Sequence, residues 1–162
     1  MTAFEPLDFY AIEELLTDEE RQVRDAVRAF VSAEVMPVLP AHNRAGTFPR
    51  DLVGRMATLG LFGANLEGYG CAGMGPVAVG LVMQELERGD SGIRSCASVQ
   101  GSLCMYPIHR YGSPAQKERW LPAMARGEAV GCFGLTEPDA GSDPAGMRTR
   151  AEPDGEGFIL HG

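Results

Sequence analysis

The sequence has no long apolar run, no excess of positive charge and no clustered metal ligands. No run approaches the roughly 18 apolar residues of a membrane span, so we predict that the chain has none. The formal net charge of −8 opposes binding to polyanions, and no basic stripe with interleaved aromatic residues offsets it. Nucleic acid is therefore excluded as a partner, whereas a small anionic ligand is not, because local groups decide its binding.

The N-terminus lacks the pattern of a targeting segment, since acidic residues come early and no basic stretch precedes an apolar one. The cysteines form no CxxC pair and have no metal-ligand spacing: Cys71, Cys96, Cys104 and Cys132. We predict free thiols in a reducing, cytoplasmic compartment. The histidines are equally scattered and are predicted to be surface or capping residues, with no metal site: His42, His109 and His161.

The remaining composition, 44% apolar and 22% charged, is typical of a globular protein of one domain, or of one domain and a fragment of another. Thr17 and Glu20 form a capping box, and apolar residues at helical spacing follow until Pro37 stops the helix. The polar face of this helix is predicted to be solvated: Arg21, Arg24, Asp25 and Arg28. Residues 1–16 are predicted to form an extended arm that packs onto a neighbouring surface.

Further helical patterns continue the chain. Helices are predicted over 49–59 with Gly60 as C-cap, over 76–88, over 96–111 with a kink or an end at Pro107, and from a second capping box at Ser113 and Gln116. Loops are predicted over 37–47, 63–75 and 90–95. The glycine-rich 63–75 stretch lacks the GxxxxGK[ST] spacing of a phosphate loop, so a flexible rim over a pocket is favoured. Leu121-Pro122 is expected to interrupt the last helix, which Gly127 ends.

The pattern changes after Gly127. Strands are predicted over Val130–Thr136 and 157–162, with a turn at 152–155. Two strands alone are marginal in water, so either they pair with a partner or the polypeptide continues. The predicted fold is mainly α, with a helical domain over 1–128 and the start of an incomplete β domain over 129–162.

The stretch from Cys132 to Asp143, CFGLTEPDAGSD, carries the most chemistry. Gly131 and Gly134 leave two positions of the predicted strand without a side chain, which often marks close approach of a ligand. Thr136 and Ser142 can each donate and accept a hydrogen bond. This suits a flat ring with a polar edge, such as a flavin. An ordinary strand that leads into an Asx-type turn remains the alternative.

Several stretches resemble one family. GCFGLTEPDAGSD is similar to the signature of the acyl-CoA dehydrogenases, flavoproteins that desaturate acyl thioesters between Cα and Cβ. YGSPAQK (111–117), followed by WLP (120–122), resembles the helix that precedes this signature. The closer resemblance is to the glutaryl-CoA dehydrogenase branch, through EGYGCAG (67–73), LERGDSG (86–92), Arg94-Ser95 and SVQGSL (98–103). The likeness implies the helical domain of that family and the first strands of its middle β domain.

The resemblance also implies roles for individual residues. FAD would contact the residues Phe133, Gly134, Leu135, Thr136, Gly141 and Ser142, the last of which would also touch the CoA moiety. Arg94, with Ser95 beside it, would bind the distal carboxylate of a glutaryl group, because a guanidinium offers a planar two-point match to a carboxylate. An alkyl-only substrate would leave Arg94 without a partner. A surface loop charge is the alternative for Arg94.

In this family a carboxylate base removes the α-proton, a hydride leaves Cβ for the flavin, and in the glutaryl branch CO₂ is lost to give crotonyl-CoA. The family places that glutamate in a C-terminal domain, so we assign no catalytic residue to this chain. We expect the N-terminal portion of a homotetrameric enzyme that reduces an electron-transferring flavoprotein, inactive as 162 residues alone. The alternatives are an acyl-CoA dehydrogenase with another polar acyl substrate and a short, non-catalytic helical module that binds partners.

Overall fold

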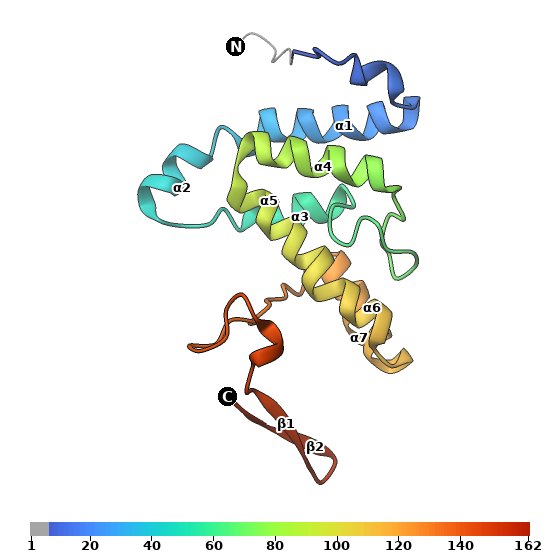
Figure 1. The fold of residues 1–162 in the computed structure, drawn as a ribbon. Helices are drawn as coiled ribbons and strands as arrows, with labels where there is room; N and C mark the ends of the chain where they lie inside the picture. The colour runs from blue at the N-terminus through green and yellow to red at the C-terminus, as the bar shows by residue number, and fades with distance from the viewer. Residues whose placement is uncertain (1–6) are drawn as a thin grey trace. The chain divides into compact units, whose positions relative to one another are not determined.

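The computed structural model describes residues 7–162, which form two compact units, residues 7–132 and Phe133–Gly162. The first unit contains every α-helix of the described chain (Figure 1). Its elements are the 3₁₀ turn η1 (Ile12–Leu15), α1 (Asp18–Phe30), the π-helix η2 (Val31–Val35), α2 (Leu39–Ala45), α3 (Asp51–Thr58), α4 (Pro76–Gly89), α5 (Ser91–Ser98), the π-helix η3 (Val99–Met105), α6 (Tyr106–Tyr111) and α7 (Pro114–Ala125). The prediction of a mainly helical chain is confirmed.

Both predicted capping boxes are present. The backbone N–H of Glu20 donates to Thr17 Oγ1 at 3.2 Å, and the Glu20 carboxylate accepts the N–H of Thr17 at 2.8 Å. Ser113 and Gln116 form the same pair of bonds at the start of α7. Each box satisfies N–H groups that the first helical turn leaves without an intrahelical partner. The sequence therefore fixes where α1 and α7 begin.

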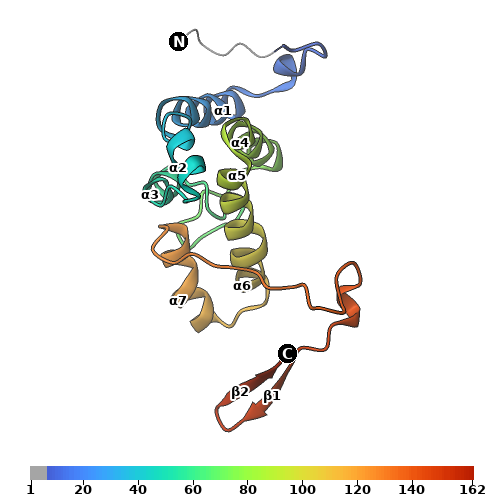
Figure 2. The ribbon, with the colours of Figure 1, turned by 90° about the vertical axis from the view of Figure 1, so that its left-hand side faces the viewer.

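The core lies between the helices, and α1 packs along α4 in both views (Figures 1 and 2). Its fully buried side chains come from most of the helices and from the segment after α3: Val31, Val35, Met56, Leu61, Phe62, Val82, Leu86, Ile93, Met105 and Leu121. Gly89 ends α4 against this core, where an added Cβ would lie 2.7 Å from Val31 Cγ1. A glycine is required there because η2 and α4 approach so closely.

Two predicted loops are helical. The 37–47 loop contains α2, whose buried Leu39 joins the core and whose end at Gly46 has φ of 65°. The 90–95 loop is the first half of α5, because the Asp90 carboxylate accepts the N–H of Ile93 at 2.9 Å and caps the helix. Ser91-Gly92 resembles a turn locally, but the cap and the buried Ile93 make it helical.

The prolines interrupt the helices less than predicted. Pro122 lies inside α7, which continues to Ala125, so the predicted interruption is wrong. Pro107 lies in the first turn of α6, directly after η3, and the helix continues to Tyr111. Because α5, η3 and α6 follow one another without a break, Pro107 lies within one continuous helical run.

The part of the N-terminal arm that the structure describes, residues 7–16, is not extended throughout. The Asp8 carboxylate accepts the N–H groups of Ile12 and Glu13, and the chain turns through η1. Phe9 and Tyr10 are exposed rather than packed. The predicted contact of Phe4 lies outside the described residues.

The second unit is a loop followed by a hairpin. It contains the 3₁₀ turn η4 (Pro144–Gly146) and the antiparallel strands β1 (Arg150–Asp154) and β2 (Gly157–His161). The predicted last strand is confirmed. The predicted turn at 152–155 is shifted, because residues 152–154 belong to β1 and the chain reverses at Gly155, whose φ is 59°. No helix of the described chain is long and apolar enough to cross a membrane.

Candidate functional site

The two residues predicted to bind an acyl tail, Arg94 and Ser95, lie together on α5. Arg94 Nε donates to Glu87 Oε2 at 2.6 Å, and Arg94 Nη1 lies 3.4 Å from Ser98 Oγ. The hydrogen bonds from Arg94 and then from Ser91 hold the pKa of Glu87 below its ordinary value. Arg94 thus lies on a helix, so the prediction of a loop position is wrong. It also has a protein partner, so the prediction that only a substrate carboxylate could pair with it is wrong.

The helix that carries Arg94 continues directly into a π-helix. Serines follow Arg94 along α5 and η3 at helical spacing, Ser98 half-buried and Ser102 exposed. π-helical turns occur frequently at functional sites, because the inserted residue changes the direction of the side chains that follow. No local pattern predicts η3, but the spacing of Arg94, Ser98 and Ser102 indicates this polar stripe.

The predicted strand over Val130–Thr136 is wrong, because these residues form no strand in the structure. A strand needs a neighbour, and within the described residues β1 and β2 pair only with each other. The residues predicted to contact a flavin are therefore exposed: Phe133 is 49% and Leu135 40% exposed, with Thr136 beside them. At Gly134 an added Cβ would have no heavy atom within 4 Å, so this side of the backbone is open.

The GSD turn is fixed by Glu137. Glu137 and Ala140 exchange two backbone hydrogen bonds, and the Glu137 carboxylate accepts the N–H groups of Arg148 and Thr149 at 2.7 and 2.9 Å. These bonds lower the pKa of Glu137, the backbone bond from Arg148 most. Gly141 and Ser142 lie exposed on the resulting closed loop, so this loop has a defined conformation within the second unit.

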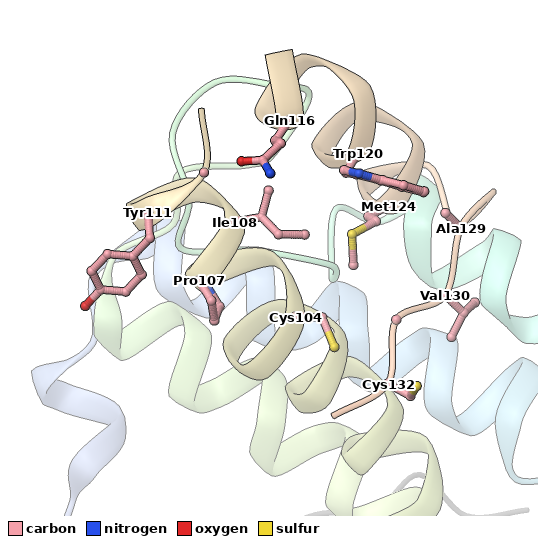
Figure 3. Close-up of a pocket in the computed structure, with 12 residues that line it drawn as sticks. Cys104, Pro107, Ile108, Tyr111, Gln116, Trp120, Met124, Ala129, Val130 and Cys132 are labelled. Carbon is pink, nitrogen blue, oxygen red and sulfur yellow. The ribbon is translucent and has the colours of Figure 1, made fainter. Parts of the chain in front are cut away.

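A cavity of about 530 Å³, which the sequence did not predict, lies within the helical unit between η3, α6, α7 and the segment from Ala129 to Cys132 (Figure 3). Its walls are mostly apolar: Pro107, Ile108, Tyr111, Trp120, Met124 and Val130. Cys104 and Cys132 also face it, and burial, then the nearby Cys132, raises the pKa of Cys104. The wall contains no ion pair among the described residues, which suits an apolar occupant.

The glycine-rich stretch 63–75 is packed rather than a rim of this cavity. Ala64 and Leu66 are buried, and their carbonyls accept the N–H groups of Met74 and Gly73 at 2.6 and 3.0 Å. Gly63 lies against Met105, where an added Cβ would be 2.7 Å from Cε. The stretch closes one side of the core.

The acidic residues Glu85, Glu87 and Glu137, which lie nearest in sequence to the family-like motifs, all have structural partners. Glu85 is buried, and its carboxylate binds Arg28 Nη2 at 2.7 Å and Arg88 Nε at 2.9 Å. Burial raises the pKa of Glu85, and the hydrogen bonds from the two arginines outweigh burial and lower it. The sequence predicted that Arg28 belongs to a solvated face, and this prediction is wrong, because Arg28 binds the buried Glu85. Glu87 and Glu137 have the partners described above.

The sequence of residues 17–128 matches the model of the acyl-CoA dehydrogenase N-terminal domain. The chain belongs to the acyl-CoA dehydrogenase family. It is 35% identical over 150 residues to the probable acyl-CoA dehydrogenase YngJ of Bacillus subtilis, which covers 91% of this chain and 39% of the relative. It is 36% identical over 151 residues to glutaryl-CoA dehydrogenase of Desulfococcus multivorans, with the same coverage of 91% and 39%.

Solved structures of the same family have the same fold. A glutaryl-CoA dehydrogenase from Mycobacterium smegmatis in complex with FADH2 superposes with a TM-score of 0.93 at 51% identity, over 97% of this chain and 41% of that one. The predicted family and fold class are confirmed. The chain spans about two fifths of the length of these acyl-CoA dehydrogenases.

Proposed function

We propose that the chain is the N-terminal portion of an FAD-dependent acyl-CoA dehydrogenase that oxidises and decarboxylates glutaryl-CoA to crotonyl-CoA. The observation that carries this proposal is Arg94, whose guanidinium lies on α5 at the start of the Ser98–Ser102 stripe and is partly exposed. The 51% identity to the Mycobacterium smegmatis glutaryl-CoA dehydrogenase supports it.

The arrangement around Arg94 suits a second carboxylate. Glu87 accepts from Nε, so the edge that carries the terminal nitrogens is directed elsewhere, with Ser98 Oγ 3.4 Å from Nη1. A distal carboxylate could accept from that edge and from the serine hydroxyl, which would order it by charge-assisted bonds. Glu87 would meanwhile offset the charge of Arg94 when no acyl tail is bound, so the pair would avoid an unpartnered cation in a closed site.

The second unit suits a flavin. The backbone from Phe133 to Thr136 is exposed, Gly134 and Gly141 leave two open positions, and Thr136 and Ser142 offer hydroxyl groups. These residues would hold FAD through the polar edge of its ring and through apolar contact with Phe133 and Leu135. Bound FAD would supply the acceptor for the hydride that leaves Cβ. The base that removes the α-proton would come from outside residues 1–162.

The remaining parts of the proposal concern the complete enzyme. We expect a cytoplasmic homotetramer that passes its electrons to an electron-transferring flavoprotein, and we expect the 162-residue chain alone to be inactive. An acyl-CoA dehydrogenase with a different polar acyl substrate is the second candidate. It is favoured by the Arg94–Glu87 ion pair, which gives the arginine a partner without any substrate carboxylate.

The test is made on the full-length enzyme purified from the native gene, with dye reduction as the assay. Wild type should show flavin absorbance and should prefer glutaryl-CoA to butyryl-CoA. Arg94→Gln should lower kcat/KM for glutaryl-CoA by about 100-fold, equivalent to roughly 3 kcal/mol, and leave butyryl-CoA oxidation unchanged, because only glutaryl-CoA carries the second carboxylate. Arg110→Gln, at an exposed arginine of α6, is the matched control.

Faster dye reduction with butyryl-CoA than with glutaryl-CoA in the wild type would favour the second candidate. An equal loss for both substrates in Arg94→Gln would contradict the assigned role of the arginine. A full-length protein without flavin absorbance would contradict the flavin site.

A further inference from the structure

Gln100 is a buried glutamine on η3 whose side chain bonds to a different part of the chain. It is 1% exposed, and both ends of its amide are used. A buried amide must find partners, and a local solution would be bonds within its own helix. Gln100 instead bonds to residues 24 to 31 positions later, at the end of α7 and in the segment that leads to Phe133.

The geometry of these bonds resembles one rung of a β-ladder. Gln100 Nε2 donates to the carbonyl of Ala129 at 2.8 Å, and Gln100 Oε1 accepts the N–H of Gly131 at 2.8 Å. The two backbone groups flank Val130, as they would if a neighbouring strand paired with that residue. The side-chain amide thus occupies the place of a strand neighbour that the described residues do not provide.

A third bond ties the same amide to α7. Gln100 Nε2 also donates to the carbonyl of Met124 at 3.1 Å, in the last helical turn. The same carbonyl also accepts the backbone N–H of Gly127 at 3.1 Å, so Gln100 adds a second donor at the end of the helix. One side chain therefore connects the end of α7 to the segment that follows it.

Gly131 fixes the distance of this segment from the helix. An added Cβ at Gly131 would lie 2.7 Å from Cys104 Cβ and 3.0 Å from Met124 Cε. Cys104, Met124 and the segment from Ala129 to Cys132 surround one end of the cavity (Figure 3). A residue with a side chain would not fit at Gly131, so a slip that placed Val130 or Cys132 there would clash.

We propose that Gln100 is a positioning residue that sets the register of residues 129–132 and, through the direct chain connection, the faces presented by Phe133 to Thr136. This rests on the proposed function, in which those residues contact FAD. Side chains alternate along an extended backbone, so a slip of one residue would exchange the face of Phe133 and Leu135 with that of Thr136. The bonds to Ala129 and Gly131 exclude that slip.

The experiment compares Gln100→Met and Gln100→Glu with wild type in the full-length enzyme. Gln22→Met, at an exposed glutamine of α1, is the matched control. Three quantities are measured: FAD affinity by titration of the apoprotein, the position of the flavin absorption bands, and hydrogen exchange of the Gly131 amide. Gln100→Met should weaken FAD binding at least about 10-fold, shift the bands and accelerate exchange at Gly131, while Gln22→Met changes none of them.

Gln100→Glu provides a test that loss of folding cannot imitate. A buried carboxylate would face the carbonyls of Met124 and Ala129, whereas its protonated form can donate to one of them and still accept from Gly131. Burial raises the pKa of such a group, so FAD affinity of this variant should recover as the pH falls, which wild type should not do.

Accelerated exchange at Gly131 with FAD affinity within about twofold of wild type would overturn the positioning role and leave the proposed function intact. The absence of pH-dependent recovery in Gln100→Glu would also overturn it, and would decide the matter if Gln100→Met does not fold. A wild-type enzyme that binds no FAD would instead overturn the proposed function, and this inference with it.

Discussion

The helical unit and the C-terminal unit are stabilised in opposite ways. In the helical unit, apolar side chains from most of the helices form one buried core, and every buried side-chain polar atom of the described residues has a hydrogen-bond partner. In residues 133–162, Ala140 is the one buried residue, and both strands are exposed along their whole length. Local hydrogen bonds, above all those of Glu137, give the second unit its shape. A core stabilises the first unit, whereas the second would need further structure to cover its apolar residues.

Two phenylalanines give the largest expected contrast. Phe62 is 1% exposed in the core, and Phe158 is 69% exposed on β2. Phe62→Ala should lower the free energy of unfolding by about 3–5 kcal/mol, because it removes a fully buried ring and leaves a cavity. Phe158→Ala should change it by less than about 0.5 kcal/mol. Urea unfolding followed by far-UV circular dichroism measures both, and equal effects would break the contrast between the units.

Glu85 tests whether the helical unit depends on its buried ion pairs. Glu85→Gln keeps the size of the side chain but leaves Arg28 and Arg88 without a buried carboxylate. We expect a loss of about 2 kcal/mol in the free energy of unfolding at pH 7. Glu87 lies on the same helix as Glu85, and its ion pair with Arg94 of α5 is partly exposed. Glu87→Gln should therefore lower the free energy of unfolding clearly less than Glu85→Gln does.

The pH dependence distinguishes charge from packing at Glu85. The folded-state pKa of Glu85 is lowered from 4.5, so its carboxylate contributes stability that is fully present above that value. The contribution is lost as the pH falls through the folded pKa. The difference in unfolding free energy between wild type and Glu85→Gln should therefore narrow below pH 4.5. A difference that stays constant down to low pH would assign the effect to packing alone.

The two units also differ in how much of them could be predicted from the sequence. The capping boxes at Thr17 and Ser113 are local signals, and both helices begin where the signals place them. The helix at Asp90 was missed because Ser91-Gly92 favours a turn locally, and the buried Ile93 overrides that preference. π-Helices such as η3 have no local signature, since they arise from an extra residue accommodated by packing.

The C-terminal unit was predicted less well for a different reason. Residues 130–136 have the composition of a strand, but strand formation depends on a neighbour that no local pattern supplies. The family signature at 132–143 did identify a family that the comparisons confirm. The partners of Arg94, Glu87 seven residues before it and Ser98 four residues after it, were recognisable only once 91–98 was known to be helical.

Of these variants, Glu137→Ala should have the smallest effect on global stability. It therefore tests whether residues 133–162 can lose local order while the helical core stays folded. Its carboxylate is exposed and accepts the N–H groups of Arg148 and Thr149, which close the loop that carries Ser142. The variant should leave the midpoint of unfolding of the helical core unchanged, while hydrogen exchange at those two amides rises to the rate of their solvated neighbours. Glu152→Ala, on exposed β1, is the matched control and should leave both amides protected.

Because Glu137 has a lowered pKa, acidification through that pKa should release the same amides in the wild type. A shift of the core midpoint in Glu137→Ala would mean that the two units unfold together, and the contrast between them would then be one of exposure alone.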